Sequence, residues 1–294
     1  MGAASLIEEL TAGGPVLTDG AWGTELQARG LEAGEMADFW NLSHPKRVEE
    51  VARAYVDAGS RVILTNTFRA NRIALERHPE REKVAEINRA GVDISQRAAS
   101  GRAFVFASVG PSGKMLITGQ VTEAELSAAF TEQSNALAEA GADALVVETM
   151  TDLGEARIAV QAAAATGLPV VACMAFGSGK QGDRTMMGVA PHQAAVELTG
   201  AGAQVVGANC GIGMEQSVFI CEAFASATDR PIWIKPNAGL PELVDGKVVY
   251  RTDAETFASH LPRLVAAGVG FIGGCCGTTP KFVEALRRRL AASP

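Results

Sequence analysis

Short runs of apolar, often β-branched residues recur along the chain, and longer amphipathic stretches separate them. Runs of this length between small or polar residues are typical of buried strands. Eight occur, at residues 15–18, 61–65, 103–109, 144–148, 169–176, 204–209, 231–235 and 270–274. The stretches between them, such as 123–141 and 153–167, are rich in alanine and repeat with a helical period, which predicts helices.

This alternation predicts the architecture. Strands that alternate with helices form parallel sheets, because the return to the starting end of the sheet needs a crossover. Eight such units in 294 residues fit an α/β fold of the (β/α)8 type, a TIM barrel, and we expect one domain over 1–294. A doubly wound open sheet is the alternative. No G-x-G-x-x-G motif follows the first strand run, and this disfavours it.

Composition narrows the class of protein. Hydrophobic residues make up 47% of the chain and charged residues 20%, so the chain can bury a large core. The net charge is −7 without a basic cluster, which argues against nucleic acid or an anionic membrane as partner. No apolar run approaches the roughly 20 residues of a membrane span, and the N-terminus does not read as a secretory signal. Five cysteines, an odd number without a disulfide pattern, indicate a reducing, cytoplasmic location.

Three of the five cysteines lie where predicted strands end. Cys210 follows the run 204–209, and the adjacent pair Cys275 and Cys276 follows the run 270–274. The carboxyl ends of barrel strands meet at one face, where barrel active sites lie, so we expect these thiols to converge. A lone cysteine at a strand end is usually only a small buried residue. Three of them in glycine-flanked turns favour a zinc site instead.

Three thiolates leave the fourth position of a tetrahedral zinc ion open for chemistry. Asn237, in the turn after 231–235, is a candidate fourth ligand in the absence of substrate, or else a helix cap. Cys173 falls inside a strand run and Cys221 in a helical stretch, and we assign both to the core. No histidine ends a predicted strand; the four are His44, His78, His192 and His260.

An open site of this kind suits the activation of a substrate thiol. Three thiolates give the zinc site a formal charge of −1 and weaken it as a Lewis acid, whereas a bound thiolate stays deprotonated and can attack an activated methyl group. Asp19 and Glu148 end two other strand runs. They could receive the ammonium group of an amino-acid substrate, or else cap helices or form ion pairs. Backbone amides in the turns at Gly20 and after Asn209 could bind its carboxylate.

The strand ends also carry longer motifs. They are DGAWGTEL (19–26), TNTF (65–68), VGPSG (109–113), VVET (146–149), GANC (207–210), KPNAGLP (235–241) and GGCCGTTP (273–280). With these motifs, the chain resembles the homocysteine S-methyltransferase family over nearly its whole length. The resemblance implies a barrel that binds zinc through Cys210, Cys275 and Cys276. It also implies methylation of homocysteine to methionine, with Asp19 and Glu148 holding the amino group of homocysteine.

The motifs bear on the methyl donor as well. Family members that use betaine carry cage tyrosines after the TF of strand 2 and the VE of strand 4, which suits a quaternary ammonium. Here those neighbourhoods read Phe68-Arg69-Ala70 and Glu148-Thr149-Met150. Members that use S-methylmethionine have DGG after strand 1, where this chain has Asp19-Gly20-Ala21. The TNTF and KPNAGLP stretches look more like the homocysteine domain of cobalamin-dependent methionine synthase, so the resemblance favours a methyl-corrinoid donor.

The chain shows no D-x-H-x-x-G corrinoid motif. By the resemblance, methylcobalamin would therefore arrive free or on a separate corrinoid protein. S-methylmethionine or betaine remains the alternative donor. Trp22 bears on this choice, because an indole at the barrel mouth can stack on a sulfonium or ammonium group, although such a residue more often packs the barrel rim.

Two other classes of function stay open. Lys235 ends a strand run, and a barrel lysine can form a Schiff base with a carbonyl substrate, as in a lyase. A lysine beside a Pro-Asn turn is, however, more often solvated or ion-paired. Alternatively, the three cysteines could form a non-enzymatic thiol sensor or zinc store. Borohydride trapping on Lys235 would support the lyase, and full activity of a Cys276→Ser variant would favour the sensor or store.

Overall fold

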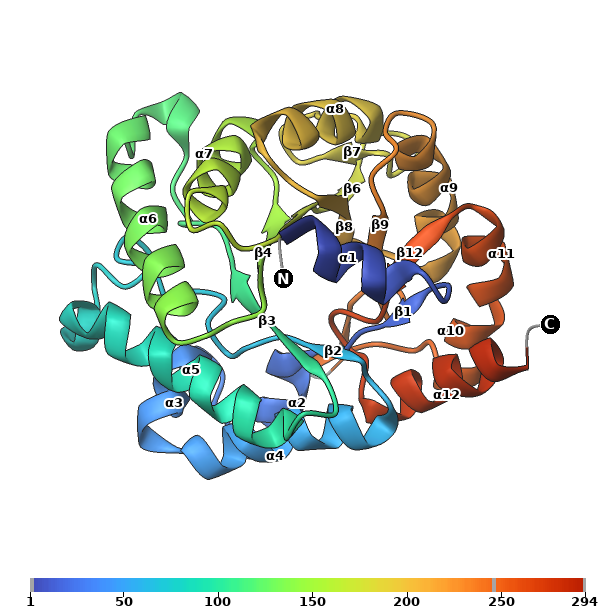
Figure 1. The fold of residues 1–294 in the computed structure, drawn as a ribbon, viewed down its shortest axis with the longest axis horizontal. Coiled ribbons are helices and arrows are strands. Elements are labelled where there is room, and N and C mark those ends of the chain that lie inside the picture. The colour runs from blue at the N-terminus through green and yellow to red at the C-terminus, as the bar shows by residue number, and fades with distance from the viewer. Residues whose placement is uncertain (1–2, 245–246, 293–294) are drawn as a thin grey trace.

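Eight parallel strands form the centre of the structure, a computed structural model that describes residues 3–244 and 247–292. In space they follow the order β1-β12-β9-β8-β5-β4-β3-β2, with parallel pairing between neighbours. The predicted (β/α)8 barrel is confirmed (Figure 1). The strands are β1 (Val16–Leu17), β2 (Val62–Ile63), β3 (Phe104–Val109), β4 (Ala144–Met150), β5 (Val170–Met174), β8 (Val205–Gly213), β9 (Ile232–Asn237) and β12 (Val269–Ile272).

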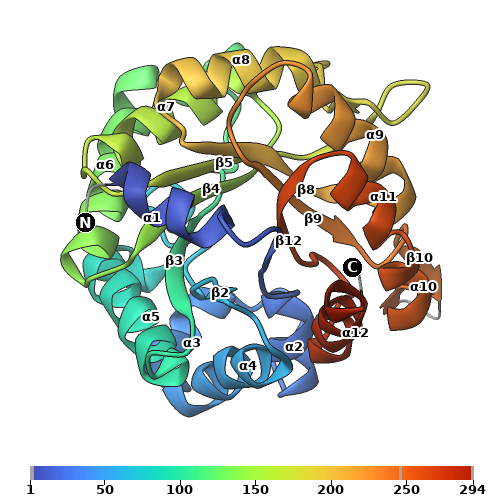
Figure 2. The ribbon, with the colours of Figure 1, turned by 45° about the vertical axis from the view of Figure 1, so that its right-hand side comes forward.

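A ring of helices surrounds the strands (Figure 2). The helical stretches predicted at 123–141 and 153–167 are confirmed as α6 and α7. Among the described residues, no helix is long and apolar enough to span a membrane. The helices after the first are α2 (Trp22–Ala28), α3 (Trp40–Ser43), α4 (Pro45–Ala58), α5 (Val84–Ala99), α6 (Glu123–Glu139), α7 (Leu153–Ala164), α8 (Pro191–Ala201), α9 (Met214–Ala225), α10 (Ala254–Ser259), α11 (Leu261–Ala266) and α12 (Pro280–Ala291).

Helix α1 (Ala3–Thr11) lies across one end of the barrel (Figures 1 and 2). Its Ile7 and Leu10 are buried against the inward-facing side chains of the strands. Three of those side chains are aromatic: the ring of Trp233 lies 6.2 Å from that of Phe106 and 5.2 Å from that of Phe271. The barrel interior is therefore a packed core. The chemistry-bearing residues lie at the opposite, carboxyl-terminal end of the strands.

The seam between β1 and β2 closes the barrel differently from the other strand pairs. These strands are shorter than the runs 15–18 and 61–65 that predicted them, and no ladder joins the two. One backbone bond crosses the seam, from Arg61 N to Leu17 O at 2.8 Å. A second contact comes from a side chain, because Leu64 N donates to Asp19 Oδ2 at 2.7 Å. A predicted site residue thus helps to complete the barrel.

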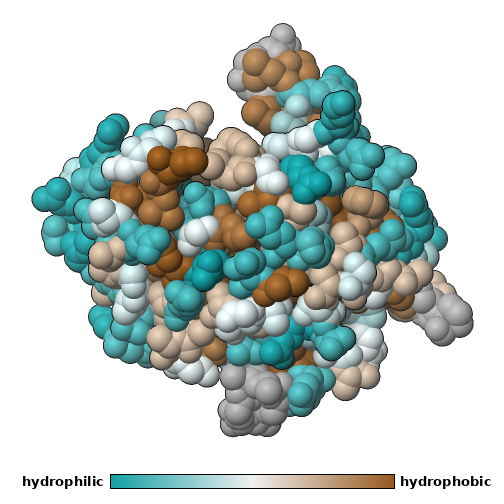
Figure 3. Space-filling view, turned by 90° about the horizontal axis from the view of Figure 1, so that it is seen from above, coloured by the Kyte–Doolittle hydropathy of each residue, from teal (hydrophilic) through white to brown (hydrophobic). Residues whose placement is uncertain are grey.

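Two antiparallel hairpins that the strand pattern did not predict lie in the loops after β5 and β9. The first pairs β6 (Phe176–Ser178) with β7 (Arg184–Thr185), and the second pairs β10 (Glu242–Val244) with β11 (Lys247–Val249). Around the second hairpin the apolar side chains of Leu240, Leu243 and Val248 are exposed. In Figure 3 an apolar segment stands out from the surface at the top of the view.

Candidate active site

The three cysteines predicted to converge do so. Cys210 lies in the last part of β8, and Cys275 and Cys276 lie in the turn after β12. Their sulfur atoms all lie within 4.8 Å of one another, with Cys210 Sγ 3.8 Å and Cys275 Sγ 4.0 Å from Cys276 Sγ. Within the described residues, this is the one cluster of His, Cys, Asp or Glu with the geometry of a metal site.

Backbone contacts hold the Cys275–Cys276 turn on the end of β9. Cys275 N donates to Pro236 O at 2.7 Å, and Cys276 O accepts from Ala238 N at 2.9 Å. Thr278 Oγ1 donates to Cys275 O at 2.7 Å. The GGCCGTTP turn is therefore tied to the KPNAGLP turn, so that the two motifs form one rigid unit around the thiols.

Glycines beside Cys210 allow close approach of the backbone. A Cβ atom at Gly207 would lie 1.9 Å from Trp233 O on the neighbouring strand, and one at Gly211 would lie 1.7 Å from Phe176 O. Gly211 also has φ +74°, a left-handed conformation that side chains other than glycine rarely adopt. Cys210 itself has φ +61°. Positive φ at a non-glycine residue is costly and is concentrated at functional sites.

Hydrogen bonds among the three thiols shift the pKa of each of them. Hydrogen bonds from Cys275 and Cys276 lower the pKa of the Cys210 thiol. The hydrogen bond to Cys210 in turn raises the pKa of both Cys275 and Cys276. The cluster therefore favours one thiolate with two thiol donors around it. A divalent cation would replace those two protons, because metal ligation needs the thiolate form.

The cluster fits zinc. Zn–S bonds of about 2.3 Å in a tetrahedron place the sulfurs about 3.8 Å apart, close to the separations found here. Asn237 is buried, its Oδ1 has no hydrogen-bond partner, and its side chain lies close enough to Cys210 to lower the pKa of that thiol. The pKa of the thiol is lowered because the Asn237 amide donates to it, so the amide nitrogen faces Cys210, and the role of Asn237 as a fourth ligand stays a prediction.

Asp19, predicted to bind the substrate amine, is fully buried and already has several partners. Its Oδ1 forms an ion pair with Lys235. Its Oδ2 accepts from Trp22 Nε1 and from Leu64 N, each at 2.7 Å. Asp19 therefore closes the barrel seam, fixes the Trp22 indole and neutralises Lys235. The ion-pair alternative considered for Asp19 is what the structure contains, and direct binding of substrate by this residue stays a prediction.

Lys235 is also buried, with a side chain only 3% exposed. Burial acts to lower its pKa, but the Asp19 and Glu148 carboxylates raise it, and the net direction is upward. The amine is therefore held protonated. A Schiff-base lysine needs a neutral, nucleophilic amine, so this environment disfavours the lyase interpretation.

Glu148 lies at the mouth end of β4 and is buried. Burial raises the pKa of its carboxyl group. Oε1 accepts from Ser108 Oγ at 2.5 Å, and Oε2 accepts from Asn209 Nδ2 at 3.2 Å. The Asn209 amide also bonds with Thr149, whose φ is +61°, and its Nδ2 lies 3.9 Å from Cys275 Sγ. Asn209 thus orients the Glu148 carboxylate, whereas the predicted contact of Asn209 with substrate stays untested.

A cavity of ≈ 470 Å³ opens beside these groups. The thiols, Gly20, Glu148 and Lys235 lie on its inner wall, and Trp22, Met36 and Phe68 provide an apolar outer wall. Trp22 also packs against the core, as expected for a rim residue. Cys173 and Cys221 lie elsewhere and are buried, so their assignment to the core is confirmed.

The strand-end pattern missed two residues of the site. Tyr250, between β11 and α10, packs its ring on Gly277 and hydrogen-bonds with Cys276. Asp38, in a short helical turn at Ala37–Phe39, lies in the cavity wall with Oδ1 accepting from Arg69 N at 2.9 Å. Both lie outside the strand ends, and no local pattern marks them as site residues.

The buried Asp38 leads to a prediction of pH dependence. Burial raises the pKa of Asp38 from 3.8 to about 6. A raised acid pKa stabilises the folded protein at low pH, and this stabilisation is lost as pH rises through about 6. We therefore expect Asp38→Asn to be more stable than the wild type above about pH 6, by roughly 3 kcal/mol because one pKa unit is about 1.4 kcal/mol. Denaturant unfolding at pH 4 and pH 8 measures this difference. Equal stability at pH 8 would contradict it.

Fold and site together define a barrel enzyme centred on three thiols. The comparisons agree: the model of the homocysteine S-methyltransferase family matches residues 16–290. The chain therefore belongs to this family and is a methyltransferase. The chain is 31% identical to mouse betaine–homocysteine S-methyltransferase 1, over 97% of this chain and 74% of that protein.

Two further proteins are similar to this chain, one in sequence and one in structure. Methionine synthase of Mycobacterium tuberculosis is 28% identical over 93% of this chain, which corresponds to 24% of that protein. The crystal structure of the metallated homocysteine methyltransferase MmuM from Escherichia coli superposes with a TM-score of 0.78 at 24% identity. It covers 94% of this chain and 96% of its own. The structural likeness supports the barrel fold.

Proposed function

We propose that this protein binds zinc through Cys210, Cys275 and Cys276 and transfers a methyl group to the sulfur of homocysteine, forming methionine. The observation that carries the proposal is the cluster of three thiols, whose sulfur separations of 3.8 and 4.0 Å suit one tetrahedral ion. Zinc bound there would lower the pKa of the substrate thiol, so that the substrate sulfur reacts as a thiolate at neutral pH.

The residues of the chain would orient the amino acid around that sulfur. Glu148 lines the same cavity as the thiols and would accept the substrate ammonium group. The charges of Asp19 and Lys235 cancel in their ion pair, so Glu148 is the acid whose negative charge stays available to the substrate ammonium group. Backbone amides at Gly20 would bind the carboxylate. The sulfur lone pair then forms the new C–S bond, while the donor keeps the electron pair of its broken bond to the methyl group.

We propose a methyl-corrinoid as the first candidate donor, free or on a separate protein. The TNTF and KPNAGLP motifs and the missing cage tyrosines support it. A cytoplasmic location, expected from the free cysteines, is consistent with this proposal.

A second candidate is a sulfonium or quaternary ammonium donor, such as S-methylmethionine or betaine. The specific observation is the outer wall of the cavity, where the indole of Trp22 and the ring of Phe68 lie near the acids Glu35 and Asp38. Aromatic faces and carboxylates both attract an onium group. The hydrogen bond from Trp22 to Asp19 fixes the indole for such a contact.

Methionine formation by the zinc-loaded protein tests both donors. Purified protein is incubated with homocysteine and, in parallel, methylcobalamin, S-methylmethionine, betaine or methyltetrahydrofolate. We expect turnover with methylcobalamin. Turnover only with S-methylmethionine or betaine would replace the first candidate by the second, and Trp22→Ala should then raise the donor KM. Absence of methionine with all four, despite bound zinc, would contradict the proposed donors.

A further inference from the structure

A second cavity, of ≈ 560 Å³, lies beside the first and is built by two loops of the same barrel face. The loop after β2 supplies Arg69, Arg77 and His78, and the loop after β3 supplies Ser112–Lys114. Arg69 lines both cavities, so they adjoin one another. The methyl-transfer mechanism described above uses none of the other residues of this second cavity.

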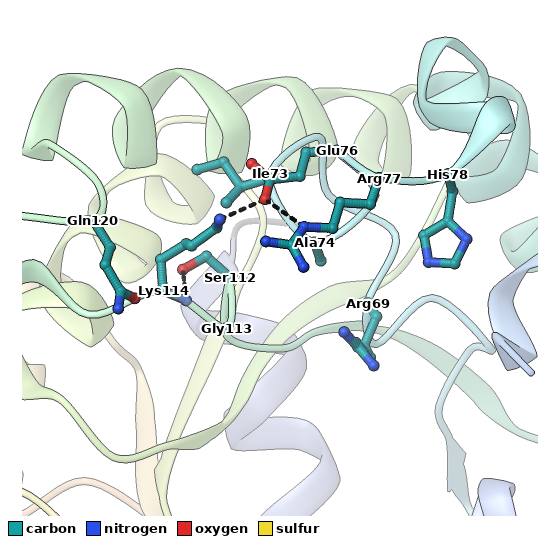
Figure 4. Close-up of a pocket in the computed structure, with 10 residues that line it drawn as sticks. All are labelled: Arg69, Ile73, Ala74, Glu76, Arg77, His78, Ser112, Gly113, Lys114 and Gln120. Carbon is teal, nitrogen blue, oxygen red and sulfur yellow. Dashed lines mark hydrogen bonds and ion pairs between the residues drawn. The ribbon is translucent and has the colours of Figure 1, made fainter. Parts of the chain in front are cut away.

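The lining of this cavity is positively charged in a chain whose net charge is −7. The lining contains the cations of Arg69, Arg77 and Lys114 and a single carboxylate, that of Glu76. Figure 4 shows Lys114 and Arg77 on either side of that carboxylate, whereas Arg69 lies apart from it. Lys114 forms an ion pair with Glu76, and Arg77 Nε lies 3.7 Å from it. Among the described residues Arg69 forms no ion pair, although its charge acts on the nearby Asp38 carboxylate. Three cations therefore lie near two carboxylates, and the cavity keeps an excess of positive charge.

Polar donors complete the lining. Lys114 N is held by Ser112 Oγ at 3.2 Å, which fixes the turn that carries the lysine. Gln120 Oε1 accepts from Met115 N at 3.3 Å, which leaves the amide NH₂ of Gln120 as a donor. Lys114 is 24% exposed, so its amine is partly desolvated. Cations and amide donors that converge from two loops on one cavity are suited to an anion.

We propose that this cavity binds a phosphate or carboxylate group of the methyl donor, at the end distant from the methyl group. The inference rests on the proposed function for its role, because the donor must place its methyl group in the adjoining cavity that contains the thiols. All four donors considered above carry such an anion: methylcobalamin has a phosphodiester and the other three have carboxylates. The volume of the second cavity favours the larger donors.

Direct binding of inorganic phosphate tests the site independently of catalysis. Isothermal titration calorimetry at low ionic strength compares the wild type with the double variant Arg77→Gln/Lys114→Met. We expect the double variant to bind phosphate at least roughly tenfold more weakly than the wild type, because hydrogen bonds to charged groups contribute more than the average hydrogen bond. We also expect salt to weaken binding by the wild type. Arg81→Gln is the matched control, since Arg81 pairs with Glu82 outside this lining, and should bind as the wild type does.

Kinetics then test the role in donor binding and distinguish the source of the anion. With methylcobalamin, the double variant should have a higher donor KM than the wild type and the same kcat. With methylcobinamide, which lacks the phosphodiester, the two proteins should have the same donor KM. S-methylmethionine and trimethylsulfonium form the corresponding pair with and without a carboxylate.

Equal phosphate binding by wild type and variant, or no saturable binding, would overturn the site. Equal KM changes for donors with and without the anion would overturn its role. If no donor gives methionine, the proposed function fails, and phosphate binding still decides the site.

Discussion

Serine in place of Cys210, Cys275 or Cys276 is expected to remove bound zinc and methyl transfer together. Each sulfur lies close to the other two, so each variant leaves only two thiolates for the ion. Loss of residues that merely support metal ligands already costs about 10–100-fold in affinity or activity. We therefore expect loss of a ligand itself to reduce methionine formation by at least about 100-fold. Zinc content after dialysis and initial rates with homocysteine measure the two effects separately.

Cys221→Ser is the matched control. Cys221 is buried in α9, with its thiol 3.6 Å from Ala267 O, an acceptor that a serine hydroxyl can also use. This variant should keep its zinc and its activity. Full activity in Cys276→Ser would contradict the proposal and favour the thiol sensor or zinc store. Zinc loss without loss of activity would mean that the thiols bind metal but that transfer does not need it.

The barrel could be predicted because its signals are local. Each strand is a short apolar run, and the glycine-flanked cysteines follow two of these runs directly. Once the strands are arranged in parallel, the geometry of a barrel brings their carboxyl ends together. Convergence of Cys210 with Cys275 and Cys276 therefore follows from strand order alone, and the structure contains it.

The partners of the site residues could not be predicted in the same way. Asp19 and Lys235 are 216 positions apart, and no local pattern pairs them. Asp38 and Tyr250 reach the cavity and the thiols from segments outside the strand ends. The side-chain amide of Asn209 bonds with Thr149 and Glu148, contacts that the sequence does not indicate, and its predicted contact with substrate stays untested. Side-chain contacts of this kind depend on tertiary packing, which a hydrophobic pattern does not record.

The buried ion pair leads to the second large effect, a loss of stability in Lys235→Met. Methionine fills much of the space of the lysine chain, but the Asp19 carboxylate then lies buried without its cation. Removal of one partner of a buried pair typically costs about 3–5 kcal/mol. We expect a loss of that size in the free energy of unfolding, measured with denaturant at pH 7. The exposed arginine of the Arg89–Glu139 pair is the control, and Arg89→Met should change stability by less than about 1 kcal/mol.

A double variant separates the uncompensated charge from the loss of packing. In Asp19→Asn/Lys235→Met neither charge remains, while the substituted amide keeps an oxygen that can accept from Leu64 N and Trp22 Nε1. If the cost arises from the unpaired carboxylate, the double variant should regain at least half of the stability that Lys235→Met loses. If the double variant is less stable than Lys235→Met, the lysine stabilises the fold mainly through packing. The barrel seam would then depend on the charge of Asp19 in its bonds to Leu64 N and Trp22 Nε1, because the asparagine oxygen can still accept from both donors.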